Sequence, residues 1–280
     1  MRNSLRSDYS GGKFLTRLDK IFLYQDCGDE PVDYAMLKAW LEKFLRRKNL
    51  IELRQDLFSF HLSSLSSRAC AERTKQIAKE LARIRIRNPE QRSFPRKASA
   101  VEIDFESRNL LREKRISAAV YDAFYFMNII AGLIPQNDKG LNFLHILITE
   151  QMIASFEPGD RYHLRSAFYG YPCIISTIGL VEAPARPREF YLKISAGIPK
   201  ELALAELKDS VLKPKDPRLT EILKSQILQA VFYQITGSPH CDRLDCMLYN
   251  AHWQEELLKS QFKGKLCKKH QKELSEYLKI

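Results

Sequence analysis

The chain has 280 residues and a mass of 32.6 kDa, which suggests one large domain or two small ones. Hydrophobic residues make up 45% and charged residues 28%, shares that argue against wholesale disorder. The 45 basic side chains outnumber the 34 acidic ones, so the formal net charge is +11. The longest weakly polar run is interrupted by Asp122 and Asn128, and no apolar signal segment opens the chain. We expect a cytoplasmic protein that makes no contact with a membrane.

The first hundred residues alternate strand and helix patterns. Residues 1–14 are polar and are predicted to form a flexible leader before an N-terminal α/β region over residues 15–100. Apolar residues at helical spacing predict two helices, over residues 32–46 and 71–83. Short apolar or alternating runs predict three strands, over residues 21–24, 49–60 and 84–87. This alternation favours helices layered on a sheet with some parallel pairing.

Residues 101–237 are predicted to hold a strand-rich region that ends in a long helix. Their patterns predict an apolar helix over residues 117–133 and five strands, over residues 101–105, 143–149, 165–169, 173–180 and 190–194. Pro217 favours a helix beginning at about Arg218, and Gly237 is its expected end. We therefore predict an α/β (or α+β) protein with a mixed twisted sheet and flanking helices.

The C-terminal residues 238–280 carry the strongest chemical signal. Two cysteines separated by four residues are followed, after twenty residues, by a cysteine and a histidine separated by two, namely Cys241, Cys246, Cys267 and His270. Two close pairs of soft ligands can converge on one tetrahedral ion, and zinc suits three thiolates and one imidazole. Four protein ligands would fill the coordination sphere, so the pattern predicts a structural zinc site. The alternative is a set of unliganded thiols on a basic tail.

The segment just upstream resembles the signature of the archaemetzincins. These zinc peptidases carry HExxHxxGxxH followed directly by C-x4-C and, further on, C-x2-C. In that signature three histidines hold the catalytic zinc, and the glutamate is the general base. Five residues of this chain stand at or beside the expected positions, namely Gly237, His240, Cys241, Cys246 and Met247.

The chain departs from this signature at the positions that carry the chemistry. Ala230 and Gln234 occupy the positions of the first two histidines, and Val231 occupies that of the glutamate. The final pair is Cys267 and His270 in place of two cysteines. Ala230 and Val231 can neither ligate a metal nor move a proton, so we expect no hydrolysis of the HExxH type.

Most of the sequence is similar to an archaeal family of uncharacterised proteins classed as metallopeptidases. The similarity is most specific in residues 175–191, 228–233 and 250–257. It implies a metzincin-like fold over residues 101–237, with an active-site helix over about 218–237. It also implies a small C-terminal subdomain over residues 238–280, where the zinc site is predicted.

Other residues could in principle rebuild a catalytic site. His252 and Glu256 lie four apart on a predicted helix, so both could face one cleft. His240 could add a second imidazole, and Glu256 could serve as a base. Each of these residues is also compatible with a purely structural role.

The sequence leads to a hypothesis and one alternative to it. The hypothesis is an archaemetzincin-like metallopeptidase-family protein with a degenerate catalytic motif, a structural zinc and a peptide or protein ligand. The alternative is a basic, zinc-stabilised protein that associates with nucleic acid by counterion release. Residues 259–280, with seven lysines against two glutamates, favour that alternative.

Overall fold

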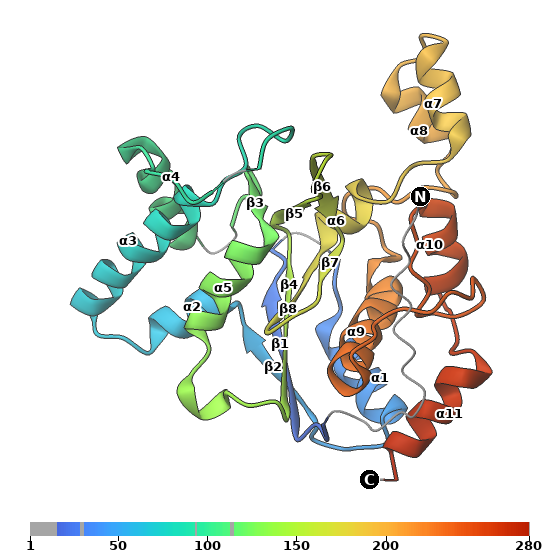
Figure 1. The fold of residues 1–280 in the computed structure, drawn as a ribbon, viewed down its shortest axis with the longest axis horizontal. Helices are drawn as coiled ribbons and strands as arrows, with labels where there is room; N and C mark the ends of the chain where they lie inside the picture. The colour runs from blue at the N-terminus through green and yellow to red at the C-terminus, as the bar shows by residue number, and fades with distance from the viewer. Residues whose placement is uncertain (1–15, 29–30, 93, 113–114, 280) are drawn as a thin grey trace.

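The computed structural model describes residues 16–28, 31–92, 94–112 and 115–279, so the leader predicted for residues 1–14 lies outside the described residues. A five-stranded sheet stands between two layers of helices, and a three-stranded sheet lies beside it (Figure 1). The predicted mixed α/β fold is confirmed. No helix within the described ranges is long and apolar enough to cross a membrane.

The main sheet has the strand order β2-β1-β4-β8-β7. Its strands are β1 (Lys20–Asp26), β2 (Ile51–Gln55), β4 (Phe143–Thr149), β8 (Cys173–Ser176) and β7 (Ala167–Phe168). The first four pair in parallel, and β7 closes the edge in the antiparallel sense. The second sheet has the order β3-β5-β6, with β3 (Val120–Asp122), β5 (Met152–Phe156) and β6 (Tyr162–Arg165).

The two faces of the main sheet bury separate hydrophobic cores. Because side chains alternate along a strand, Ile21 and Leu23 of β1 join one core while Phe22 and Tyr24 join the other. Helices α1 (Tyr34–Phe44) and α9 (Leu219–Thr236) cover the first face. Helices α2 (Leu57–Ser63), α3 (Ser67–Arg83) and α5 (Ala123–Leu133) cover the second.

The remaining helices extend these two layers. Helix α4 (Ala100–Leu110) packs on α3, a short 3₁₀ helix spans Gln136–Asp138, and α6 (Thr177–Glu182) follows β8 directly. Helices α7 (Arg188–Ser195) and α8 (Lys200–Glu206) project from one corner as a hairpin (Figure 1). The C-terminal α10 (Gln254–Gln261) and α11 (Lys268–Tyr277) lie on the side of the sheet that α1 and α9 cover (Figure 1).

Two segments predicted as strands are helices. Residues 101–105 belong to α4, because the Ser99 side chain and the Glu102 carboxylate cap each other's backbone N–H groups and start the helix. Residues 190–194 belong to α7, which begins directly after Pro187. Proline at a helix start costs no intrahelical hydrogen bond, so it favours this beginning.

Other predicted elements are shorter than expected or change type partway. Residues 49–60 form β2 and then α2, since the Asp56 carboxylate accepts the backbone N–H groups that start the helix. Residues 117–133 and 173–180 likewise divide into a strand and a helix, with Asp122 and Ser176 as the caps. Residues 165–169 divide between β6 and β7, and residues 84–87 form only a bridge at Arg85.

Candidate functional site

Helix α9 is the element on which the candidate site is built. It spans Leu219–Thr236, as predicted for residues 218–237, and it ends at Gly237, whose φ of 77° is the left-handed conformation that glycine favours. Most of the helix is buried although about half of its residues are polar, so these polar side chains must find partners or a cavity. Three of them, Gln226, Gln229 and Tyr233, face the same cavity.

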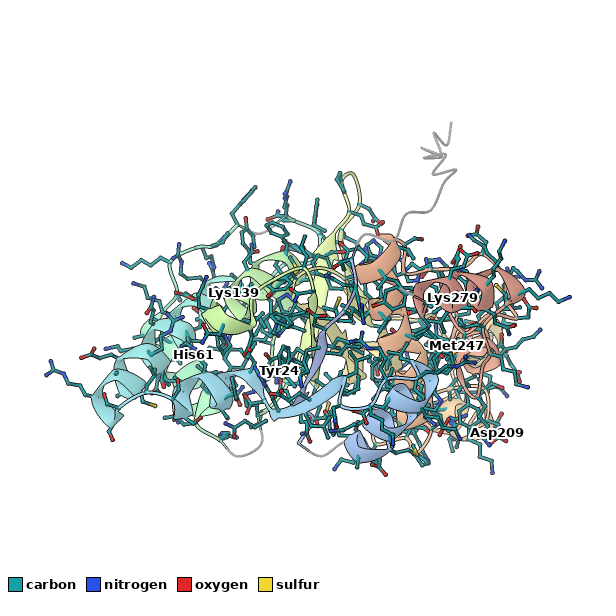
Figure 2. The ribbon with its side chains drawn as sticks, turned by 90° about the horizontal axis from the view of Figure 1, so that it is seen from below. Tyr24, His61, Lys139, Asp209, Met247 and Lys279 are labelled. Carbon is teal, nitrogen blue, oxygen red and sulfur yellow. The ribbon has the colours of Figure 1, made fainter. Side chains whose placement is uncertain are left out.

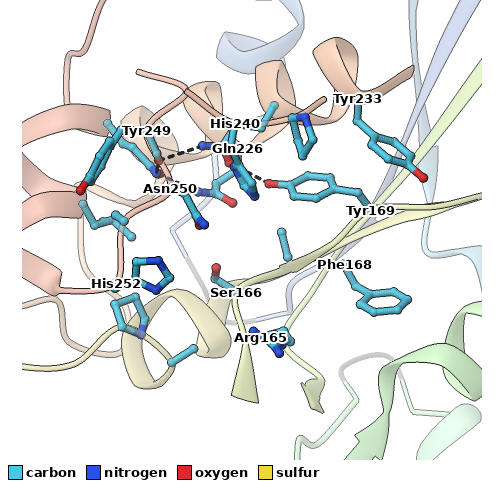
Figure 3. A pocket seen from close by; sticks show the side chains of 18 of the residues that line it. Arg165, Ser166, Phe168, Tyr169, Gln226, Tyr233, His240, Tyr249, Asn250 and His252 are labelled. Atoms are coloured by element: carbon cyan, nitrogen blue, oxygen red, sulfur yellow. Dashed lines mark hydrogen bonds between the residues drawn. The ribbon is translucent and has the colours of Figure 1, made fainter. Parts of the chain in front are cut away.

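This cavity, called here the α9 cavity, has a volume of about 490 Å³. One wall is α9, and the opposite wall is the segment from Leu164 to Tyr169, which includes the edge strand β7. The chain from Pro239 to His252 contributes a third side (Figure 3). The volume lies within the usual range for pockets that bind small molecules or side chains.

A chain of hydrogen bonds ties the walls of the cavity together. The Tyr169 hydroxyl donates to Oε1 of Gln229 at 2.7 Å, and Nε2 of Gln229 donates to the Tyr249 carbonyl at 3.2 Å. Gln261 donates to the same carbonyl, and it accepts Nε2 of Gln226 at 2.6 Å. Oε1 of Gln226 is buried and accepts no hydrogen bond, so one acceptor remains available on this wall.

Two of the three catalytic candidates line this cavity. The His240 ring packs edge-on against Tyr169 with ring centroids 5.5 Å apart, and its buried Nδ1 has no hydrogen-bond partner. Burial, together with the nearby His252 ring, lowers the pKa of His240. His252 is exposed and precedes α10, so the prediction that it shares a helix with Glu256 is wrong.

Glu256, the third candidate, has a different role. Its Oε2 atom accepts the backbone N–H groups of His252 at 2.9 Å and Trp253 at 3.2 Å, which caps the start of α10. Glu256 is absent from the cavity lining, and the described lining residues include no carboxylate at all. Arg165 is the only side chain of fixed charge among them, and it binds Ser155 and Glu157.

The residues at the degenerate motif positions do not face the cavity. Ala230 and Val231 are fully buried in the core, and Gln234 donates its side-chain N–H to the Leu141 carbonyl at 2.7 Å. The side chains that face the cavity from α9 come one residue earlier, at positions 229 and 233. Motif alignment missed them, and because polar residues recur along the whole helix, the sequence gives no clear signal for these two.

The four predicted metal ligands meet at one point and are called here the cysteine–histidine cluster. They are Cys241, Cys246, Cys267 and His270, all buried, and their ligand atoms lie within 4.8 Å of one another. The Sγ atoms of Cys241 and Cys267 are 3.9 Å apart, and Cys246 Sγ is 3.7 Å from His270 Nδ1. A tetrahedral zinc with bonds near 2.0–2.3 Å requires separations of about 3.5–3.8 Å. The two separations lie close to this range, while Sγ of Cys267 lies nearer to His270 Nδ1, at 3.1 Å. Three thiols and one imidazole are a donor set that suits zinc.

Neighbouring groups suit this cluster to a cation. Backbone N–H groups of Arg243 and Cys267 point at the sulfurs of Cys241 and Cys246, at 3.4 and 3.5 Å. Nε2 of His270 lies 3.7 Å from the Glu273 carboxylate, an outer partner typical of metal-bound imidazoles. Burial raises the pKa of Cys246 to about 12, so without a cation this thiol is protonated at neutral pH.

The cluster also packs against α9, through Phe232. Phe232 of α9 packs edge-on against the His270 ring, with centroids 5.3 Å apart. Three cluster residues belong to the same hydrophobic core as Val231, Phe232 and Ile235, namely Cys241, Cys246 and Cys267. The cluster thus packs directly against the helix that carries Gln229 and Tyr233.

Comparisons with known proteins identify the family of this chain. Residues 17–277 match the model of the Probable metallopeptidase family (DUF6775), and the chain belongs to that family. Among solved structures it is similar to the crystal structure of archaemetzincin from Methanopyrus kandleri, with 13% sequence identity and a TM-score of 0.44. That likeness covers 94% of this chain and 97% of the other. The comparison with curated proteins found no match.

Proposed function

We propose that this member of the metallopeptidase family binds a peptide or protein segment in the α9 cavity and does not hydrolyse it. The observation that carries the proposal is the absence of any carboxylate among the described residues that line the cavity. A zinc peptidase needs three protein ligands, an open coordination position and a base that takes a proton from bound water. The cavity offers the imidazoles of His240 and His252 and no acidic base.

The amides on α9 support binding in preference to catalysis. Gln229 uses both ends of its side chain in bonds to Tyr169 and Tyr249, so it is held in place and is a poor metal ligand. Oε1 of Gln226 and Nδ1 of His240 are buried polar atoms without partners. A backbone or side-chain amide of a ligand could bond to both atoms, which would relieve the cost of leaving them unpaired.

The cysteine–histidine cluster supplies the second half of the proposal. Three thiolates and one imidazole would hold a single zinc with no position left for water or substrate, so we assign the ion a structural role. It would order residues 238–280 and, through Phe232, fix the position of α9. In this family member, zinc would thus help to position the helix that forms one wall of the cavity.

A peptide library tests both parts of the binding claim. The full-length zinc-loaded protein should leave the library intact while retaining a subset of its members. Gln229→Leu should weaken retention about tenfold, because it leaves the buried Tyr169 hydroxyl without its acceptor. Gln76→Leu, on the exposed face of α3, is the matched control and should change nothing. Chelator-sensitive cleavage that is lost in His240→Ala would refute the proposal.

A further inference from the structure

A second concave surface lies at the C-terminal end of α1 and shares no residue with the α9 cavity. This surface, called here the basic groove, has a volume of about 830 Å³ and runs between α1 and α11. Its floor is apolar, with Leu45, Leu266 and Leu274 buried in it. Both helices lie at the end of the molecule where Figure 2 shows Lys279, far from His61 at the other end.

Cations line both sides of the groove. Lys43, Arg46 and Arg47 come from the end of α1, while Lys265 and Lys279 flank α11. No acidic residue is among the described lining residues. Lys43, Arg46, Lys265 and Lys279 are exposed, and within the described ranges none of them forms an ion pair. Positive charge on both sides of an apolar floor favours a ligand that is apolar on one face and negatively charged along both edges of that face.

The backbone conformation of Arg46, on the rim of the groove, is unusual for an arginine. Arg46 follows α1 with a φ of 51°, a conformation that glycine adopts at helix ends without steric cost. An arginine there places a guanidinium on the rim of the groove, although this backbone conformation is less favourable for arginine than for glycine.

We propose that the basic groove binds an acidic amphipathic helix of a partner protein. Apolar side chains of such a helix, three and four residues apart, would fill the leucine floor, and carboxylates on its flanks would meet the cations on the two sides. The chain's own residues 1–15 have the wrong charge for this groove, since they carry Arg2, Arg6 and Lys13 against Asp8. Charge complementarity thus favours a separate acidic partner.

The groove is less suited to nucleic acid. Single strands bind by stacking bases on free aromatic faces. In the groove the rings of Trp40 and Phe44 stack on each other with centroids 4.8 Å apart, and the Lys224 ammonium lies 5.7 Å from the Trp40 ring centroid. The face that Trp40 and Phe44 turn to each other is therefore not open to a base, and the leucine floor offers no polar group to a base edge.

The two tryptophans of the chain allow a direct test, because Trp40 lines the groove and Trp253 does not. In full-length Trp253→Phe protein, the probe is a synthetic 18-residue helix with leucine at positions three and four apart and glutamate on both flanks. We expect saturable binding that shifts Trp40 fluorescence and weakens with salt. A peptide of the same composition with its leucines scrambled should bind at least tenfold more weakly.

Charge variants locate the binding surface. Lys43→Glu with Lys279→Glu should weaken binding at least tenfold, whereas Lys79→Glu with Lys200→Glu, the same charge change on α3 and α8, should leave it within twofold. Arg46→Gly should weaken binding without lowering the unfolding temperature, since glycine suits that backbone. Equal loss in both double variants, no response of Trp40, or equal displacement by single-stranded DNA or anionic vesicles would each overturn the proposal.

Discussion

The histidine at position 145 shows how a buried ring can link stability to pH. His145 is fully buried on β4; the Tyr24 hydroxyl lies 2.9 Å from Nδ1, and the Asp138 carbonyl lies 2.8 Å from Nε2. A neutral ring that accepts from Tyr24 and donates to Asp138 satisfies both contacts. A protonated ring could no longer accept from Tyr24 and would carry a buried charge. Burial accordingly lowers the pKa of His145 from 6.5 to about 4.

The pH dependence of unfolding follows from that pKa. The unfolded chain binds the proton below pH 6.5 and the folded chain only near pH 4, so stability is full above 6.5 and falls as the pH drops. At 1.36 kcal/mol per unit, the loss over this window is roughly 3 kcal/mol. Denaturant unfolding at several pH values should show a shallower dependence in His145→Phe. An unchanged slope in that variant would contradict the assignment.

A single glycine sets the approach of α6 to β6. A Cβ atom at Gly179 would lie 2.2 Å from the backbone carbonyl oxygen of Arg165, a contact that only backbone movement can relieve. We expect Gly179→Ala to lower the free energy of unfolding by about 1–3 kcal/mol. Because Arg165 lines the α9 cavity, ligand retention should fall as well.

Position 132 provides the control for this substitution. A Cβ at Gly132, inside α5, would meet no atom within 4 Å. Gly132→Ala should therefore raise stability by up to about 1 kcal/mol, as expected for alanine in a helix interior. Calorimetry on both variants separates the steric effect from helix propensity. Equal behaviour of the two would rule out the close contact as the cause.

At the scale of elements, the long regular segments were predictable and the short ones were not. The spans of α9 and β4 agree with the sequence patterns, because each has many residues of one periodicity. Several of the errors lie where one polar side chain changes the element, although the helix over residues 190–194 begins after a proline. Asp56, Asp122 and Ser176 each end a strand and cap a helix within one residue, a choice that hydrophobic periodicity does not record.

One part of the candidate site could be predicted from the sequence, and another part could not. Spacing alone brought together the four residues of the cysteine–histidine cluster, since ligand pairs close in sequence need only one fold-back to meet. The role of Glu256 could not be predicted from the sequence, because its hydrogen bond with the His252 backbone N–H depends on where α10 begins. The cavity face of α9 depends on helix rotation, which neighbouring packing decides. The domain bounds at residues 100 and 237 stay a prediction.

The C-terminal segment should depend on its metal for order. Helix α11 buries only His270, Leu274 and Tyr277, and the first of these belongs to the cysteine–histidine cluster. Cys246→Ser should release zinc and speed proteolysis within this segment at least tenfold, because binding and local folding are coupled. Cys70→Ser, outside the cluster, is the matched control. A C-terminal segment that stays equally resistant in both variants would show that packing alone holds it.

At the scale of the whole molecule, the two concave surfaces and the cluster lie on the side of the main sheet that α1 and α9 cover. Helix α9 carries the α9 cavity on one side and packs against His270 on another, while α11, directly after Cys267, forms a wall of the basic groove. Zinc in the cluster would therefore order both surfaces at once. The opposite face of the sheet carries α2, α3 and α5 on a separate core.

The metal content of the purified full-length protein distinguishes a purely structural zinc from an additional zinc in the α9 cavity. We expect one zinc in the cysteine–histidine cluster and none in the α9 cavity. Elemental analysis should give one zinc per chain in the wild type, one in His240→Ala, and close to none in Cys246→Ser. Two zinc ions per chain, with one lost in His240→Ala or His252→Ala, would establish a second, open metal site in the cavity and contradict a non-hydrolytic role.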